Sequence, residues 1–97
     1  MTAAGPDDFQ LLQAWRGGDE VAADQLVRRY YGAVLRFFEV RTRFAEDLTQ
    51  RTFLACVEAR ERIRSESSFR SYLFGIARRQ LFRYFEDQRR VDRLASL

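Results

Sequence analysis

The stretch DEVAADQLVRRYYGAVLRFFEVR, residues 19–41, decides the fold class. Its apolar side chains recur at steps of three and four residues, which is the period of one face of an α-helix. Asp19 precedes the first of them and is placed to cap the helix. The apolar positions are Ala23, Leu26, Val27, Tyr30, Val34, Phe37 and Phe38. The stretch therefore predicts a long amphipathic helix that runs to about Arg41.

The segment before this helix predicts a shorter one. Either Asp7 or Asp8 can cap it, and the pair Gly17-Gly18 ends it. Its apolar positions are Phe9, Leu11, Leu12 and Trp15.

Two further helices follow, over about 45–60 and about 69–90. The run Ser-Glu-Ser-Ser at 65–68 predicts a loop between them, and Ser67 or Ser68 can cap the last helix. The sequence shows neither β alternation nor an internal repeat. We predict an all-α domain, a compact bundle of about four helices over residues 8–91. Residues 1–7 are expected to be flexible, and 92–97 to be the start of a linker or a frayed end.

Composition excludes several classes of function. The chain has 97 residues, no His and one Cys, so a His-based triad, His metal ligands and an intramolecular disulfide are excluded. No nucleophile, base and orienting group occur together. We therefore expect no enzyme activity, cofactor, metal or small-molecule substrate.

The sequence also carries information on location. A single Cys fits a reducing cytoplasm. No stretch approaches the 18 apolar residues of a membrane span, and the N-terminus lacks the basic and apolar regions of a signal peptide. A cytoplasmic protein without a membrane partner is expected.

Charge is unevenly distributed along the chain. The net charge is +3, and all 17 basic residues are Arg. Residues 1–48 have a net charge of −2 and residues 49–97 of +5, with seven Arg between 70 and 93. A basic C-terminal third favours an anionic partner for that segment. A solvated helix face is the alternative.

The helix expected over 45–60 has two apolar faces. One is a stripe of small residues for close packing, which includes Cys56. Phe53, Leu54 and Val57 project from other sides, beside acidic and amide side chains, as suits docking onto another protein's helix. The alternative is that the first helix covers Phe53 and Val57. The stripe consists of Ala45, Leu48, Thr52, Ala55, Cys56 and Ala59.

The last helix separates a core face from a basic line. Tyr72, Arg79, Arg83 and Arg90 follow that line at steps of seven, four and seven residues. Guanidinium groups bind phosphates and guanine edges, and aromatic rings stack on unpaired bases. The alternative is surface Arg paired with acids at 86 and 87. Ser71, Arg78, Phe82 and Arg89 lie beside the basic line, and Phe69, Leu73, Ile76, Ala77, Leu81 and Tyr84 form the core face.

Two motifs resemble a known family. FAEDLTQRTFL, residues 44–54, is similar to the Ala-Glu-Asp-Leu-x-Gln-x-x-Phe signature of extracytoplasmic-function sigma factors. SFRSYLFGIAR, residues 68–78, is similar to their Ser-Phe-x-x-Trp-Leu-x-x-Ile-Ala segment. Leu11-Leu12, Gly18-Asp19 and Tyr30-Tyr31 match the same layout. The resemblance covers about residues 8–91 and implies a sigma region-2 domain.

The resemblance implies two macromolecular partners. The first is core RNA polymerase, whose beta-prime clamp coiled coil would contact Asp47, Gln50, Phe53 and Leu54. The second is promoter DNA at the minus-ten element, including the melted non-template strand, with one flipped base held by residues 63–69. The DNA-binding residues would be Phe69, Arg70, Tyr72, Arg78, Arg79, Arg83 and Arg90. An interaction module for an anti-sigma factor, using the face of Phe53, Leu54 and Val57, is the alternative function.

Three positions depart from the family pattern. Tyr72 replaces the usual Trp, Arg79 stands where Asn is usual, and Arg51 occupies a commonly acidic position. Family members typically continue into a helix-turn-helix domain that reads the minus-thirty-five element. A cut-out domain and a natural minimal protein both stay open at this point.

Overall fold

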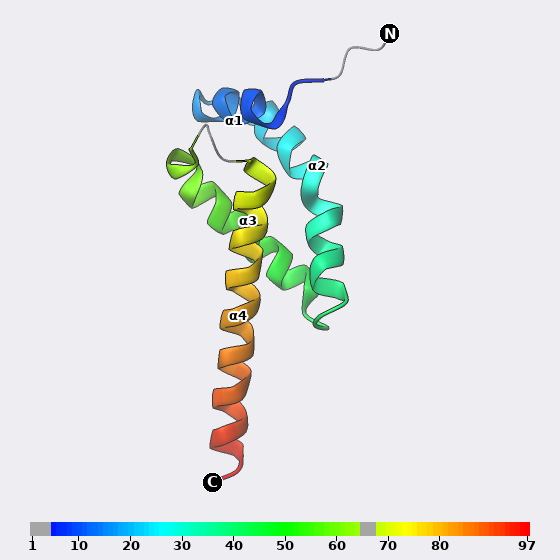
Figure 1. Cartoon of the computed structure of the whole chain (residues 1–97), viewed down its shortest axis with the longest axis vertical. Coiled ribbons are helices and arrows are strands. Elements are labelled where there is room, and N and C mark those ends of the chain that lie inside the picture. Colours follow the sequence, from blue (N-terminus) through cyan, green and yellow to red (C-terminus); the bar gives the residue numbers. More distant parts are fainter. Residues whose placement is uncertain (1–4, 65–67) are drawn as a thin grey trace.

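The computed structural model describes residues 5–64 and 68–97, and no strand occurs among them. The prediction of an all-α fold is confirmed. Figure 1 shows α1 across one end of the molecule, α2 and α4 descending from that end, and α3 crossing behind α4. The helices are α1 (Asp8–Arg16), α2 (Glu20–Glu39), α3 (Ala45–Ala59) and α4 (Phe69–Ala95), and a single 3-10 turn, η1 (Arg60–Arg62), continues α3.

Side-chain caps fix three of the helix starts. The Asp7 carboxylate accepts a hydrogen bond from the Gln10 backbone N–H at 2.8 Å, and the Gln10 side chain accepts one from the Asp7 N–H at 2.9 Å. This reciprocal capping box makes Asp7 rather than Asp8 the cap of α1. Asp19 accepts from two backbone amides of α2, at 3.0 and 3.2 Å. Ser68 accepts from the first turn of α4 at 3.3 Å.

The turn between α2 and α3 begins slightly earlier than expected. α2 ends at Glu39 rather than at about Arg41. The backbone N–H groups of Arg41 and Thr42 both donate to the carbonyl oxygen of Phe38, each at 2.9 Å. The Arg41 bond spans three residues, as in a 3-10 turn, and together with the Thr42 bond it closes the turn.

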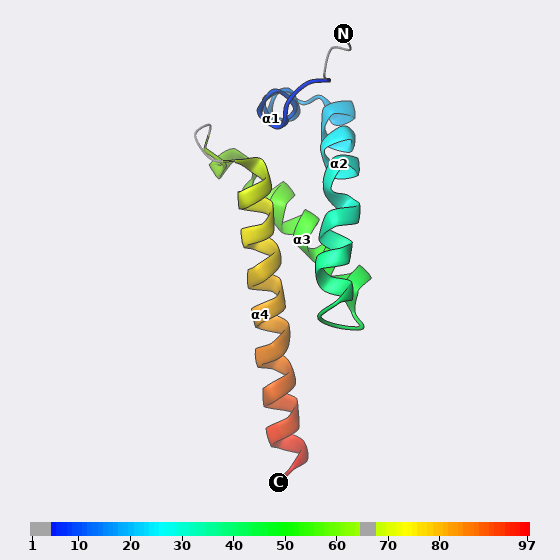
Figure 2. The ribbon, with the colours of Figure 1, turned by 45° about the vertical axis from the view of Figure 1, so that its right-hand side comes forward.

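α4 is longer than expected. The prediction that the helix ends near Arg90 was wrong, because α4 continues to Ala95. Residues 91–95 contain no Gly or Pro to stop it. The last turns of α4 project alone beyond α1–α3 (Figure 2). The radius of gyration is accordingly 16.0 Å, against about 12.5 Å for a compact chain of this length.

The core extends from the packing of α1 on α2 to that of α3 on α2 and α4. Leu26, Val34 and Phe38 of α2 are buried there, as the helical period predicted. Leu81 and Tyr84, which were expected in the core, are only half-buried because they lie where α4 begins to leave the body. The fully enclosed positions of α4 are Phe69, Leu73, Ile76 and Ala77.

Phe53 is a core residue rather than part of an open face. It is 9% exposed, and its ring stacks on that of Tyr31 at 5.8 Å with 15° between the planes. Phe53 is therefore covered, but by Tyr31 of α2 and not by the first helix, as the alternative had it. Leu54 is 63% exposed and Val57 is 37% exposed, so the open part of this face is narrower than expected.

Two buried threonines complete the packed side of α3. The hydroxyls of Thr49 and Thr52 donate to the carbonyl oxygens of Ala45 and Leu48, each at 2.7 Å. These bonds satisfy the hydroxyls within the helix. The buried stripe is therefore wider than the small-residue pattern indicated, since Thr49 was not part of it.

Candidate functional site

A groove of about 510 Å³ lies between α3 and α4. Tyr72, Arg79 and Arg83 line it from α4, and Arg51 and Arg62 line it from the opposite side. Four guanidinium groups thus share the groove with a single carboxylate, that of Glu58. The groove is electropositive and suits phosphate oxygens.

The groove brings together three of the seven residues that the sequence assigned to DNA. Tyr72 is half-buried at its wall, whereas Arg79 and Arg83 are exposed. Ile76, one turn from Tyr72, is buried in the wall and joins α4 to α3. The steps of seven and four residues place these three side chains on one side of α4.

The other four predicted DNA-binding residues lie elsewhere. Phe69 is 4% exposed, with its ring 5.6 Å from that of Tyr30, so this ring is a core contact. Arg90 lies far along α4, in a shallow hollow with Glu86, Arg89 and Arg93.

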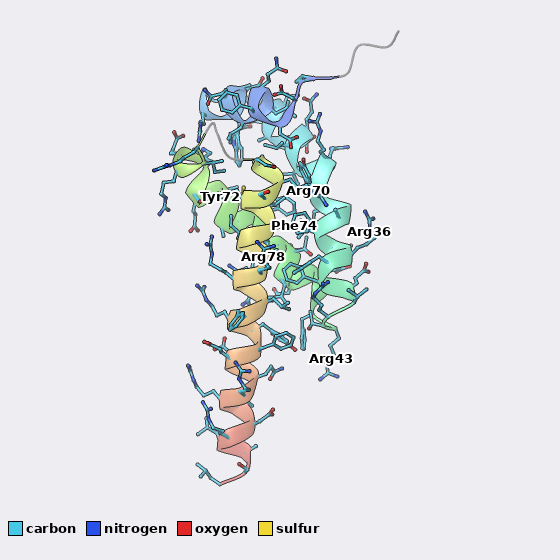
Figure 3. All side chains as sticks on the ribbon, viewed as in Figure 1. Arg36, Arg43, Arg70, Tyr72, Phe74 and Arg78 are labelled. Carbon is cyan, nitrogen blue, oxygen red and sulfur yellow. The ribbon has the colours of Figure 1, made fainter. Side chains whose placement is uncertain are left out.

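Arg70 and Arg78 are exposed on different sides of α4 from the groove. Arg70 stacks over the ring of Phe74 at 4.9 Å. Figure 3 shows Arg70 and Phe74 on the side of α4 that faces α2, and Tyr72 on the opposite side. The predicted DNA-binding set therefore surrounds α4 instead of following one line.

The segment predicted to hold a flipped base, residues 63–69, is fixed at both ends. Ile63 is buried, and its carbonyl oxygen accepts a hydrogen bond from Arg16. Ser68 caps α4. The interior positions 65–67 lie outside the described residues.

A second groove, of about 310 Å³, lies between α2 and α3 and is almost wholly apolar. Gln50, Phe53 and Leu54, three of the four predicted polymerase contacts, line it. Val27, Tyr31 and Val57 complete the lining. Such a groove matches the apolar side of a partner helix.

Asp47, the fourth predicted polymerase contact, lies apart from the apolar groove. It is paired with Arg51 at 3.0 Å and lines a notch of about 350 Å³ with Phe44, Tyr84 and other residues of α3 and α4. The rings of Phe44 and Tyr84 lie 5.7 Å apart in this notch.

Three titratable side chains have shifted pKa values. Burial, together with a hydrogen bond to Asp8, raises the pKa of the Tyr30 phenol to about 12. Burial raises the pKa of the Cys56 thiol to about 11, so this thiol is a core group. Hydrogen bonds from Gln88 and Thr42 lower the pKa of Tyr84.

Sequence reasoning missed two arginines. Arg62 reaches the α3–α4 groove because the 3-10 turn extends α3 past its expected end. Arg16 joins α1 to the end of η1. The sequence signal for each was an Arg near a predicted helix end, and Arg62 stands there between two further arginines, Arg60 and Arg64.

The part of the chain that carries both grooves matches a known family. Residues 23–91 match Sigma-70 region 2. The chain belongs to this family. Region 2 of sigma-70 factors binds core RNA polymerase and recognises the minus-ten promoter element in transcription initiation, which is not a catalytic role. Comparison with curated proteins and with solved structures finds no match.

Neither a metal centre nor a membrane span accompanies the two grooves in the described part of this region 2 domain. Within residues 5–64 and 68–97, no group of three or more metal-ligating side chains occurs. No helix over those same residues combines the length and apolar character needed to cross a bilayer.

Proposed function

We propose that this region 2 domain is of the extracytoplasmic-function type. The α2–α3 groove docks on the beta-prime clamp coiled coil of core RNA polymerase. The α3–α4 groove holds the melted non-template strand of the minus-ten element. The two motifs at 44–54 and 68–78 support the subtype.

One observation carries the proposal. Leu54 lines both grooves, so the apolar and the electropositive surfaces meet along a single edge of α3. A strand in the α3–α4 groove would lie directly beside a polymerase helix in the α2–α3 groove. The arrangement explains why α3 exposes a large apolar side chain between two polar neighbours, Gln50 and Glu58.

Separation of the DNA strands is favoured because the domain binds the single strand more tightly than the duplex. Guanidinium groups in the α3–α4 groove hold the phosphates, and the Tyr72 ring offers a stacking surface for an unpaired base. Contacts that only a single strand makes offset an unstacking cost of about a few kcal/mol. No covalent step is involved.

Arg79 alters the expected base preference. A guanidinium donates hydrogen bonds and accepts none, whereas the amide of Asn does both. With Arg79 on the groove wall, acceptor edges such as those of guanine are favoured next to it.

The direct test mixes the 97-residue chain with core RNA polymerase and with single-stranded minus-ten DNA. Binding is measured at low salt by fluorescence anisotropy of labelled DNA and by gel filtration with the polymerase. Binding to both partners is expected. The absence of binding to either partner would contradict the proposal.

A second candidate uses the apolar groove alone. Because the lining of the α2–α3 groove is almost wholly apolar, it also fits a helix of an anti-sigma factor. Such a module would bind minus-ten DNA no better than random DNA. A preference for minus-ten DNA therefore separates the two functions.

A further inference from the structure

A chain of four side chains connects α2 to α4 outside both grooves. The guanidinium of Arg41 lies over the Phe37 ring at 4.2 Å. Phe37 meets the Phe74 ring edge-on at 5.8 Å and 75°. Arg70 lies over Phe74 at 4.9 Å. We call these four residues the Arg–Phe cluster.

The cluster fixes two cations in advance of any ligand. An arginine stacked on an aromatic face has already lost much of its rotamer freedom, so binding an anion costs less entropy. Nη1 of Arg41 donates to the carbonyl oxygen of Phe37 at 2.7 Å, which fixes this guanidinium further and leaves its other donors for a ligand. Each Phe ring has one face occupied by its own Arg, so the cluster presents cations rather than stacking surfaces.

Within residues 5–64 and 68–97, no acidic side chain forms an ion pair with the cluster. The ion pairs found among the described residues involve Arg28, Arg29, Arg51 and Arg60. Arg41 and Arg70 take part in none of them, and both are exposed. Their charges therefore face solvent.

A third cation connects the cluster with the α3–α4 groove. Arg78 is exposed, and its guanidinium lies 4.0 Å from the point where a Cβ on Gly75 would stand. At 100° per residue, Gly75 falls on the outer side of α4, between Phe74 and Arg79. Positive charge thus continues around the open side of α4, from the cluster through Arg78 to the groove, and Gly75 places no side chain in between.

We propose that the Arg–Phe cluster is a second phosphate-binding surface, which holds the backbone of the same single-stranded DNA without reading its bases. The proposal rests on the proposed function, since it extends the strand from the α3–α4 groove across α4. A nucleic-acid strand is favoured over an acidic protein because Arg70 and Arg78 are on the helix that lines the groove.

The test measures binding of fluorescein-labelled single-stranded 12-mers, one of minus-ten sequence and one of poly-dT, over a series of salt concentrations. Arg41→Gln is expected to weaken binding of both strands equally, by about threefold to tenfold. It should lower the salt slope by about 0.7 for each phosphate that the variant no longer neutralises. Arg28→Gln is the matched control, since it removes the same charge from an ion-paired site on α2, and wild-type binding is expected.

A second variant keeps the net charge and tests whether the orientation of Arg41 matters for DNA binding. Phe37→Leu keeps Arg41 but removes the ring that orients it, so weaker binding with an unchanged helical circular dichroism spectrum is expected. Unchanged affinity and slope in both Arg41→Gln and Phe37→Leu would overturn the cluster's role, as would a weakening confined to one DNA sequence. If the cluster variants bind normally but Arg83→Ala weakens binding, only the cluster's role is overturned and the proposed function stands. If the wild-type chain binds neither strand, the cluster's role and the proposed function are both contradicted.

Discussion

Arg16 of α1 donates two hydrogen bonds to the carbonyl oxygen of Arg60, 44 residues further along the chain. Its Nε and Nη2 atoms lie 2.9 and 2.7 Å from that oxygen, and Nη2 also donates to Ile63. One guanidinium thus binds the carbonyl groups at the start and just after the end of η1, where α3 gives way to the following segment. α1 lies outside the residues that match region 2, yet it holds the end of the helix that lines both grooves.

The Arg16 contact is expected to stabilise the whole fold. Arg16→Met keeps the length of the side chain but removes the donors, and should lower the free energy of unfolding by about 1–2 kcal/mol. Urea unfolding followed by circular dichroism measures the change. Arg28→Met, which breaks an exposed ion pair, should cost about 0.5 kcal/mol or less. Equal costs for the two variants would contradict this role.

Arg83 is expected to contact a phosphate in the α3–α4 groove. Arg83→Ala should weaken binding of single-stranded minus-ten DNA and lower the salt slope by about 0.7, because fewer counterions are released. Anisotropy titrations between low and moderate salt measure both quantities. An unchanged slope would remove Arg83 from the interface.

Two residues that line the α2–α3 groove, exposed Leu54 and buried Phe53, are expected to respond differently to substitution by Ala. Gln50→Ala combined with Leu54→Ala should impair binding to core polymerase while changing stability by about 0.5 kcal/mol or less, since both side chains are exposed. Phe53→Ala should instead cost about 3 kcal/mol or more, because it empties a buried site. A polymerase pull-down measures the loss of binding in the double variant, and thermal unfolding measures the loss of stability in Phe53→Ala. Loss of helicity in the double variant would return Leu54 to the core.

The sequence predicted those parts of the fold that depend on local periodicity. Leu26, Val34, Phe38 and Leu73 are buried because each follows the apolar side of its own helix. The cover over Phe53 could not be predicted in this way, since it depends on how α2 crosses α3. The Arg16 contact is likewise a property of tertiary structure.

The candidate site was predicted only in part for a related reason. A helical wheel identifies residues on one side of α4 but not which neighbour that side faces. The wheel placed Tyr72, Arg79, Arg83 and Arg90 on one line, but Arg90 lies too far along α4 to line the groove. Arg70 entered the predicted set through the family resemblance, and it lies on the side of α4 that faces α2. The extra length of α4 left no periodic apolar signal, since residues 91–95 are exposed, and the absence of Gly and Pro is its only trace in the sequence.

Alanine at Gly75 and at Gly32 is expected to raise stability in both cases, but to move a neighbouring arginine only at Gly32. Gly75→Ala and Gly32→Ala should each raise the free energy of unfolding by about 0.5–1 kcal/mol, since Ala favours helix over Gly. At Gly75 a Cβ meets only Arg78, at an ordinary 4.0 Å, but at Gly32 it approaches the Arg36 guanidinium to 3.2 Å. Arg36 should therefore shift in Gly32→Ala alone, which NMR of its Nε–H resonance would detect. Destabilisation by Gly75→Ala would contradict the open space described there.

Cys56 is expected to be unreactive in the folded protein. Burial raises its pKa from 9.0 to about 11, so at pH 8 little thiolate exists and reagents cannot reach it. Because the unfolded chain releases this proton first, the stabilisation from Cys56 is full below pH 9 and is lost as the pH rises toward 11. At pH 8 a thiol reagent should modify Cys56 only as fast as the folded protein opens to expose it. In urea, where the chain is unfolded, the reaction should be immediate. Immediate reaction without urea would contradict the buried position.

The anchoring of residues 63 and 68 has a consequence for how such a domain diversifies. Arg16 holds the carbonyl of Ile63, and the Ser68 side chain begins α4. The partners that fix these two ends, Arg16 and the Ser71 amide, lie outside the intervening positions. Neither bond uses a group from positions 64–67, so substitutions there are expected to leave both anchors in place. The sequence between the two anchors can therefore diverge at little cost in folding free energy.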